Sequence, residues 1–433
     1  MLKTTATAPA TATATAPAHL PFRDPAMLLG HIRQTLDFYH PRCIDPSGGF
    51  FHFFKDDGTV YDAATRHLVS STRFVFNYAQ AARHVGDPAF SAALRHGVAF
   101  LRDAHRNPAS GGYAWELRWR DGRATTTDAT NHCYGLAFVL LAYAHAFGAG
   151  MPEARAFIDE TFTLMEARFW DDRHGLYADQ ASADWSQLDP YRGQNANMHC
   201  CEALLAAFEA TGAPHFLHRA ELLARNITLR QAALSESGGL IWEHYHADWT
   251  IDRDYNRDDP KNLFRPWSFQ PGHFTEWAKL LLNLERHGAA LRNAPDWLLA
   301  RARALFAAAT PAWDEHYGGL CYGLGIDGQV CDDDKYFWVQ AESIAAAAAL
   351  AVRTGEAAYW DWYERLWSYS WEHFVDHRYG AWYRILARDN RKPSDEKSPA
   401  GKTDYHTMGA CYEVLKVLQA PTLAGRASLS PPG

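Results

Sequence analysis

Two kinds of helical pattern alternate along the chain. In the first kind, Asp87 and Pro88 supply an N-cap and a first-turn proline, and apolar residues follow at positions 90, 94, 98 and 101 as a single stripe. The second kind is apolar on nearly every side, as in residues 133–147 and 344–352. Because a helix without a polar face has to be buried all round, these patterns predict half-exposed outer helices that alternate with fully buried inner helices.

A turn motif recurs between the helical segments. Glycines followed by short aromatic or alternating segments stand near positions 49, 112, 175, 239, 319 and 380, at intervals of about 63 residues with one interval of about 80. A fixed period of this kind indicates a repeat architecture. Six repeats of an inner and an outer helix predict an all-α fold, an (α/α)6 barrel with short β-hairpins between the helix pairs. The alternative is an open helical solenoid, which would show less contrast between inner and outer helices.

The longer interval contains an insertion. Residues 248–266 are charged and rich in Asn and Asp, and this composition predicts a long loop. Long loops in compact domains are often functional. Since the insertion precedes the helix that begins near Pro271, we expect it to lie over the mouth of a central cavity as a lid.

Composition narrows the classes of function. The 433 residues are 47% hydrophobic and 14% aromatic, with a net charge of -8 and no run of Lys or Arg, so nucleic acid and anionic membranes are poor candidates for partners. Seven cysteines without a C-x-x-C pair indicate reduced thiols in a cytoplasmic protein, and no apolar run approaches the length of a membrane span. We expect residues 1–20, an Ala/Thr/Pro-rich tail, to be disordered, residues 21–420 to form a single catalytic domain, and residues 421–433 to be loose. A monomer or a homodimer is compatible with this pattern.

The stretch 270–277 contains the most suggestive chemistry. Pro271 and Gly272 begin a predicted helix, so His273 and Glu276 lie in its first turn on one face. An imidazole beside a carboxylate suits proton transfer near neutral pH. Such a pair considered alone is more often a structural hydrogen bond, so the interpretation depends on whether other inner helices bring matching groups to the same place.

The other predicted inner helices do bring such groups, because polar residues interrupt their starts. Such residues are costly in an apolar helix unless they are paired, so six sets that converge on one cavity indicate a site. The His-x-x-Glu spacing occurs twice, at His199/Glu202 and His273/Glu276, and a third histidine, His406, begins the last helix. No H-E-x-x-H or similar ligand spacing is present, so we expect no metal. The converging residues are Arg66, Arg73, Asp128, Asn131, His132, Arg192, Gln194, Asn195, Asn197, His199, Glu202, Gln270, His273, Glu276, Trp277, Asp333, Lys335, Trp338, Gln340, Glu342, Lys402, Asp404, Tyr405 and His406.

Several of these residues have structural explanations of their own. His132 is equally well explained as a satisfied core histidine, Arg66 as a cap or ion pair at a helix end, and Glu202 as an ion-pair partner of Arg192. Trp277 and Trp338 fit ordinary core packing. We favour a role in the site for His199, His273, Glu276 and His406.

The runs Arg-Gly-Gln-Asn-Ala-Asn-Met-His at 192–199, Pro-Gly-His-Phe-Thr-Glu-Trp at 271–277, Trp-Val-Gln-Ala-Glu at 338–342 and Tyr-His at 405–406 resemble those of the N-acylglucosamine 2-epimerase superfamily. The similarity extends over residues 25–420, and the first run is most similar to the mannose isomerase branch. The resemblance implies an (α/α)6 barrel that acts on reducing-end sugars without a metal or redox cofactor.

The resemblance also implies roles for individual residues. His273 and His406 match the acid/base pair that exchanges protons at C1 and C2 of the sugar, and Glu276 matches the carboxylate that supports His273. His199 matches a histidine implicated in ring opening, and Arg73 matches an arginine near O1 and O2. The expected substrate-binding residues are Asn131, Gln194, Asn195, Trp277, Trp338 and Glu342, with Asn131 standing where many relatives have Lys.

Two reactions remain open from the sequence. The first is isomerisation of an aldose to a ketose through an enediolate, D-mannose to D-fructose above all. The second is 2-epimerisation of the mannose/glucose, N-acylglucosamine or cellobiose type. Glycoside hydrolysis would assign Glu276 and Glu342 as paired carboxylates and would leave three histidines without a task. A non-catalytic sugar-binding protein would need no such proton-transfer set.

Overall fold

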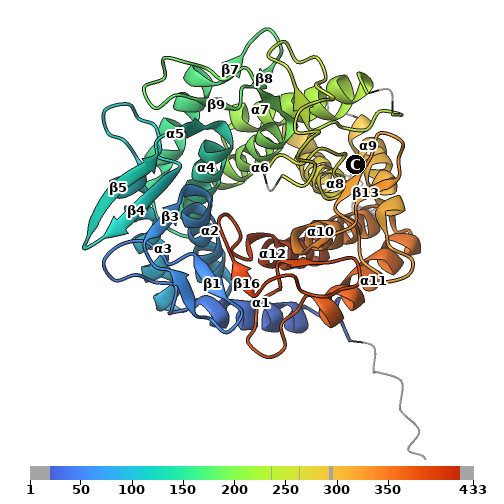
Figure 1. Ribbon diagram of the computed structural model, residues 1–433, viewed down its shortest axis with the longest axis horizontal. Helices are drawn as coiled ribbons and strands as arrows, with labels where there is room; N and C mark the ends of the chain where they lie inside the picture. The colour runs from blue at the N-terminus through green and yellow to red at the C-terminus, as the bar shows by residue number, and fades with distance from the viewer. Residues whose placement is uncertain (1–19, 236, 263, 292–295, 420–433) are drawn as a thin grey trace, which may run out of the picture.

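The computed structural model describes residues 20–235, 237–262, 264–291 and 296–419, and these form a closed ring of helices (Figure 1). The expected tails, 1–20 and 421–433, lie almost wholly outside the described residues. Six helices form the inner ring: α2 (Leu68–His84), α4 (Cys133–Gly148), α6 (Gln194–Thr211), α8 (Pro271–Arg286), α10 (Phe337–Thr354) and α12 (Tyr405–Gln419). Six more surround them: α1 (Pro25–Tyr39), α3 (Pro88–Phe100), α5 (Ala154–Arg168), α7 (Pro214–Arg225), α9 (Trp297–Ala309) and α11 (Ala357–His373).

The two helical patterns of the sequence correspond to the two rings. In α3 the Asp87 side chain accepts a hydrogen bond from the backbone N–H of Ala89, and the predicted stripe at positions 90, 94, 98 and 101 is buried. In α10 the alanines of residues 345–349 are buried, and α4 is buried on nearly every side. The (α/α)6 barrel is therefore confirmed, and the open solenoid is not.

Short strands connect the helices. Strand pairs within one connection include β1 (Phe53–Lys55) with β2 (Val60–Asp62), β4 (Glu116–Arg120) with β5 (Arg123–Asp128), β7 (Trp170–Asp171) with β8 (Leu176–Tyr177), and β12 (Gly323–Leu324) with β13 (Val330–Asp332). Other pairs join a strand at the start of an inner helix to the following connection: β3 (Thr65–His67) with β4, β6 (Asn131–His132) with β9 (Gln180–Ala181), β10 (Arg192–Gly193) with β11 (His244–Tyr245), and β14 (Lys335–Tyr336) with β15 (Ile385–Leu386).

These cross-connection pairs correct part of the sequence-based prediction. The hairpins are present, but several strands bridge neighbouring repeats, which the sequence pattern did not indicate. Arg66, Asn131, Arg192 and Lys335 belong to such strands and precede their helices. The pairing holds the start of four inner helices against the next repeat, and it thereby fixes the positions of side chains in their first turns.

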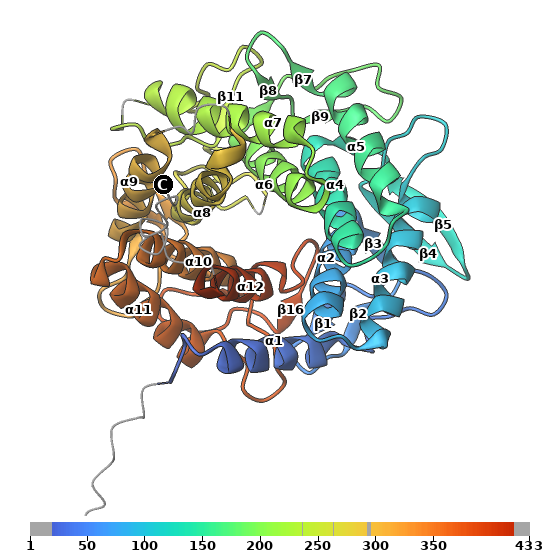
Figure 2. The same ribbon diagram turned by 180° about the vertical axis from the view of Figure 1, so that it is seen from behind.

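The ring closes where the two ends of the described chain meet. Strand β16 (Glu396–Ser398) pairs antiparallel with β1, and α1 lies beside α12 (Figure 2). The Tyr39 hydroxyl at the end of α1 donates a hydrogen bond of 2.7 Å to Asp404, the residue before α12. Helix α1 therefore supports the start of the last inner helix directly.

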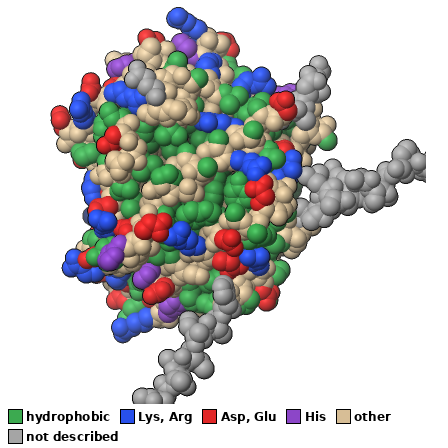
Figure 3. Space-filling view, turned by 90° about the vertical axis from the view of Figure 1, so that its right-hand side faces the viewer, with side chains coloured by type: hydrophobic (Ala, Val, Ile, Leu, Met, Phe, Trp, Pro, Cys, Tyr) green, Lys and Arg blue, Asp and Glu red, His purple; other side chains and the backbone are tan. Residues whose placement is uncertain are grey.

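The surface agrees with the charge pattern of the sequence. Lys and Arg side chains are interspersed with Asp and Glu on the face shown in Figure 3. In the described ranges, no helix combines the length and the apolar character that crossing a membrane requires.

Candidate active site

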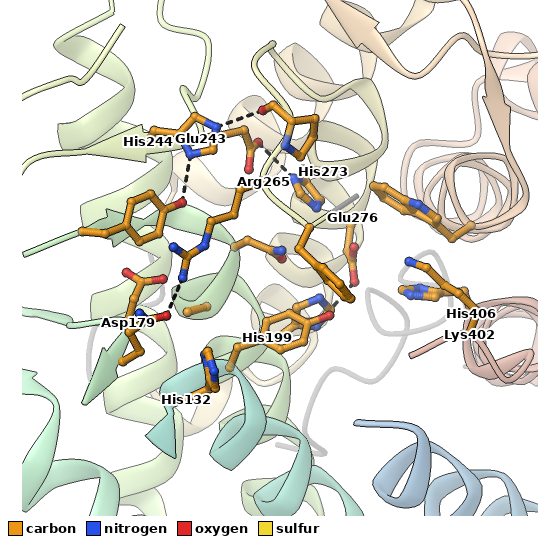
Figure 4. Close-up of a pocket in the computed structure, with 18 of the residues that line it drawn as sticks. His132, Asp179, His199, Glu243, His244, Arg265, His273, Glu276, Lys402 and His406 are labelled. Atoms are coloured by element: carbon orange, nitrogen blue, oxygen red, sulfur yellow. Dashed lines mark hydrogen bonds and ion pairs between the residues drawn. The ribbon is translucent and has the colours of Figure 1, made fainter. Parts of the chain in front are cut away.

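A cavity of about 310 Å³ lies at the end of the barrel where the inner helices begin. Figure 4 shows side chains that line it. Each inner helix contributes to its lining, through Arg73 of α2, Tyr134 of α4, His199 of α6, His273 and Glu276 of α8, Trp338 of α10 and His406 of α12. The convergence that the sequence predicted is therefore present.

His273 is held by a residue that the sequence analysis missed. Its Nδ1 lies 2.9 Å from Oε1 of Glu243 (Figure 4). The same Nδ1 lies 3.0 Å from Nε2 of Gln194. Gln194 also donates to both oxygens of Glu243, at 3.1 and 3.0 Å, so it orients the carboxylate. A carboxylate beside Nδ1 favours the tautomer with its proton there, which leaves Nε2 free to exchange a proton.

The predicted support of His273 by Glu276 is wrong. Glu276 Oε1 lies 3.9 Å from His199 Nδ1, and neither carboxyl oxygen has a hydrogen-bond partner among the described residues. Burial first, and then the charge of Glu342, raises the pKa of Glu276 well above its usual range. This shift favours the neutral carboxylic acid of Glu276, which can donate a hydrogen bond at the edge of the cavity.

His406 has its own carboxylate partner. Its Nδ1 lies 2.7 Å from Oε1 of Glu342, whose other oxygen accepts a hydrogen bond from Lys279 at 2.5 Å. Burial, together with the charges of Arg73 and Lys402, lowers the pKa of His406 well below its usual range. The ring is therefore neutral near pH 7 and able to accept a proton.

His199 completes the set of three histidines. Its Nδ1 lies 3.0 Å from Oε2 of Glu202, and its ring stands edge-on to Tyr134 with the centroids 5.1 Å apart. Burial lowers the pKa of His199, although Glu202 opposes the shift. Glu202 is thus the partner of His199, and Arg192 instead donates to the carbonyl oxygens of Asp189 and Tyr191.

Two basic side chains, Arg73 and Lys402, line the cavity. The guanidinium of Arg73 stacks on Phe138 and Tyr405, at 4.5 and 4.8 Å from the ring centroids, and donates to the carbonyl oxygen of Gly401. Lys402 also lines the cavity, and burial, with the nearby Arg73, lowers the pKa of its amine well below the usual range. Both lie where they can face a developing oxyanion.

The other predicted substrate contacts divide into two groups. Asn195 and Trp338 line the cavity, whereas Gln194, Trp277 and Glu342 form a layer behind its wall, with Trp277 Nε1 donating to Gln194 at 2.7 Å. Asn131 lies elsewhere: its Oδ1 accepts from the Tyr113 N–H at 3.2 Å, and its amide donates to the Ser182 carbonyl at 3.0 Å. The expected contact of Asn131 with substrate is therefore not supported, because its side chain is committed to backbone groups.

The ambiguous residues are also resolved. Arg66 pairs with Asp45 at 2.5 Å outside the cavity, which is the structural role, whereas His132 lines the cavity with its ring 4.1 Å from that of Trp115. Burial lowers the pKa of His132 to about 4.

The insertion lies at the mouth of the cavity, where Phe264, Arg265 and Pro266 form part of the lining. The Arg265 guanidinium lies 4.0 Å from the ring centroid of Tyr191 and donates to Gln180 at 2.8 Å. The predicted position is confirmed, while closure of the insertion as a lid stays a prediction. The cavity is also lined by Arg265, His244, Tyr322 and Asp179, for which the sequence pattern gave no signal.

Two groups of side chains come close enough to share a cation, His199 with Glu202 and Glu276, and Glu276 with Glu342 and His406. The Lys279 ammonium already lies between two of these carboxylates, bonded to Glu342 and 3.8 Å from Glu202. A third group, Asp332 to Asp334, has Lys261 within 3.0 Å. Lysine ammonium groups thus already lie beside carboxylates of each group. The expectation that the protein needs no metal stays a prediction.

Three histidines, each beside a carboxylate, surround a cavity at the end of the (α/α)6 barrel where the inner helices begin. This arrangement is typical of enzymes that transfer protons on a small substrate. The model of the N-acylglucosamine 2-epimerase family matches residues 49–410, so the chain belongs to this family of isomerases and epimerases.

Individual relatives support the same placement. A D-mannose isomerase of Marinomonas mediterranea is 57% identical over 398 residues, covering 92% of this chain and 98% of the relative. A D-mannose isomerase of Thermobifida fusca is 39% identical over 343 residues, covering 78% and 82%. A crystal structure of D-mannose isomerase superposes with a TM-score of 0.88 at 56% identity, covering 92% of this chain and all of that one.

Proposed function

We propose that the protein interconverts D-mannose and D-fructose by metal-independent proton transfer. The observation that carries this proposal is the pair of histidines, His273 and His406, whose rings lie 5.1 and 5.8 Å from that of Trp338 and whose Nδ1 atoms are each held by a carboxylate. The similarity to proteins named D-mannose isomerase supports the choice of sugar.

In the proposed reaction the sugar opens with the help of His199, and neutral His406 removes the proton from C2. The electrons of that C–H bond form an enediolate, whose oxyanion faces Arg73 and Lys402. His273 moves a proton between O2 and O1, while Glu276 donates a hydrogen bond to a sugar oxygen. His406 then returns a proton to C1, which completes the ketose.

Epimerisation at C2 is the second candidate, because both histidine–carboxylate pairs suit acid/base roles on opposite faces of one carbon. Glycoside hydrolysis has no comparable support. It would need Glu342 beside the bond that breaks, yet this carboxylate lies behind His406 and bonds Lys279.

The test is incubation of the full chain with D-mannose, with fructose and glucose assayed separately. Isomerisation in heavy water places deuterium on C1 of the fructose, whereas epimerisation places it on C2 of the glucose. If glucose labelled at C2 is the main product, the isomerase assignment is wrong and the epimerase assignment replaces it.

We also propose that the enzyme works in the cytoplasm, or in another reducing compartment. All seven cysteines lie among the described residues and are unpaired; six are buried, and Cys331 is exposed. Exposed free thiols persist best under reducing conditions.

A further inference from the structure

Lys402, just before α12, brings an amine into the active cavity. Among the residues that the structure describes, none makes a hydrogen bond or an ion pair with this amine. Figure 4 shows the amine beside the ring of His406 and turned toward Glu276. After burial and Arg73, the charge of Lys402 is the next cause that lowers the pKa of His406, so the two groups lie close together.

The surroundings of this amine make it a nucleophile. Burial first, and then the charges of Arg73 and Arg384, lowers the pKa of Lys402 well below its usual range, which favours the uncharged amine. A lysine with the usual pKa of about 10.4 is uncharged in only about one molecule in a thousand near pH 7.4. A lysine that is desolvated beside another cation is therefore the kind that attacks carbonyl carbons.

Burial alone does not distinguish Lys402 from other lysines of the chain. Burial also lowers the pKa of Lys335 and of Lys397. However, Lys335 donates to the carbonyl oxygen of Arg388 at 2.6 Å, and Lys397 donates to that of Gly380 at 2.7 Å. Neither of these two lysines lines the active cavity. Lys402 differs because its amine has no such partner and faces the space that a substrate enters.

We propose that Lys402 is a covalent attachment site for an open-chain aldose, at which the aldehyde carbon C1 forms an imine with the amine. This inference rests on one part of the proposed function, namely that the sugar binds in its open form with C1 near His406. As the C1–N bond forms, one amine proton passes to the aldehyde oxygen. The resulting hydroxyl leaves as water when Glu276 gives it a proton, and Glu276 regains a proton from the nitrogen. A C1=N bond remains.

The side chains that isomerise the free sugar can also rearrange this imine. When His406 removes the proton from C2 and returns it to C1, the C2–O group becomes a carbonyl and the O2 proton passes to nitrogen. The lysine then carries a ketose bound through C1, which is a stable ketosamine. The ketosamine is an isomer of the imine, so no oxidant or reductant is consumed. Long incubation with the aldose should therefore inactivate the enzyme in proportion to the modification of Lys402.

The first experiment incubates the full chain with D-mannose and sodium cyanoborohydride at neutral pH, which reduces the imine to a stable secondary amine. Peptide mass spectrometry follows the modification of each lysine with time. We expect Lys402 to be modified at least about tenfold faster than buried Lys335 and Lys397 or exposed Lys261. 1,5-Anhydro-D-mannitol, which keeps the sugar ring but lacks a carbonyl carbon, should slow the modification of Lys402 alone.

The second experiment separates imine formation from turnover. 2-Deoxy-D-glucose has an aldehyde but no hydroxyl at C2, so it cannot become a ketose. It should modify Lys402 when cyanoborohydride is present and leave no stable adduct without it, whereas mannose alone should leave the ketosamine. His406→Asn should still be modified in the presence of the reductant, and it should accumulate less ketosamine from mannose alone.

Modification of Lys402 that is no faster than that of the other three lysines overturns the inference, as does modification that the anhydro sugar does not slow. Both comparisons are made within the wild-type chain, so they do not depend on the folding of a variant. If mannose yields no fructose, the proposed function fails. If fructose forms and Lys402 stays unmodified, only this inference fails.

Discussion

The pairing of His273 with Glu243 makes a prediction that separates the structure from the sequence pattern. Glu243→Gln keeps the size of a buried side chain and removes its charge. A hydrogen bond to a charged group contributes about 1.5–3 kcal/mol, so we expect kcat to fall roughly 10- to 100-fold with little change in KM. Because burial raises the pKa of Glu276 and so favours its neutral acid, Glu276→Gln exchanges one uncharged hydrogen-bond donor for another. Because a neutral hydrogen bond contributes about 0.5–1.5 kcal/mol, we expect a loss of at most about tenfold.

The assay is steady-state conversion of mannose to fructose at neutral pH for both variants, with circular dichroism and Tm to show that each is folded. The amide oxygen of the new side chain can still accept a bond from Gln194, so the fold should tolerate Glu243→Gln. A near-wild-type kcat in Glu243→Gln beside a larger loss in Glu276→Gln would refute the reasoning and restore the partner that the sequence pattern suggested.

Four further outcomes follow from the site and the core. His273→Asn and His406→Asn should each lower kcat by about 10²- to 10⁴-fold without loss of fold by circular dichroism, and near-wild-type rates would contradict the acid/base assignment. Exhaustive treatment with EDTA should leave activity unchanged, and a loss that one divalent ion restores would show a required metal. Arg265→Ala should raise KM for the sugar with little change in kcat, because it removes part of the cavity mouth, and an unchanged KM would mean that the mouth does not contact substrate. Burial lowers the pKa of His145 to about 4, against about 6.5 when unfolded, so its contribution to stability is complete above pH 6.5 and is lost as the pH falls toward 4. His145→Gln should therefore reduce the slope of the unfolding free energy against pH by about 1.4 kcal/mol per unit in that window, as measured by urea denaturation, and an unchanged slope would contradict the burial of His145.

The helical rings were predictable because their signals are local. The apolar stripe of α3 and the all-round apolar pattern of α4 each follow from a single periodicity, and the turn period gives the number of repeats. The strand pairs between repeats left no such signal, since two-residue strands such as Arg192–Gly193 are too short to show alternation. Residues that the sequence pattern assigned to the starts of inner helices, namely Arg66, Asn131, Arg192 and Lys335, therefore lie in the strands before those helices.

The site was predictable in its histidines and not in their partners. His199 and Glu202 are one helical turn apart and do pair, so the same spacing at His273 and Glu276 suggested the same bond. The ring of His273 instead meets Glu243, 30 residues earlier in the chain. Which way a first-turn side chain leans depends on the neighbouring strand pair β10–β11, and that neighbour exists only once the repeats have packed. Asn131 was expected in the site because it is a polar residue just before an inner helix. Its amide instead makes hydrogen bonds with backbone groups of the connecting loops.

The seam at which the ring closes also has a consequence for synthesis. Tyr39 and Asp404, whose hydrogen bond holds the start of the His406 helix, are 365 residues apart. At ribosomal rates of about 5–20 residues per second, the first of them waits roughly 20–70 s for the second. Throughout that interval the apolar side of α1 has no α12 to cover it, and no nascent chain can turn over sugar. Catalysis therefore begins only when the last-made inner helix has docked against the first-made outer one.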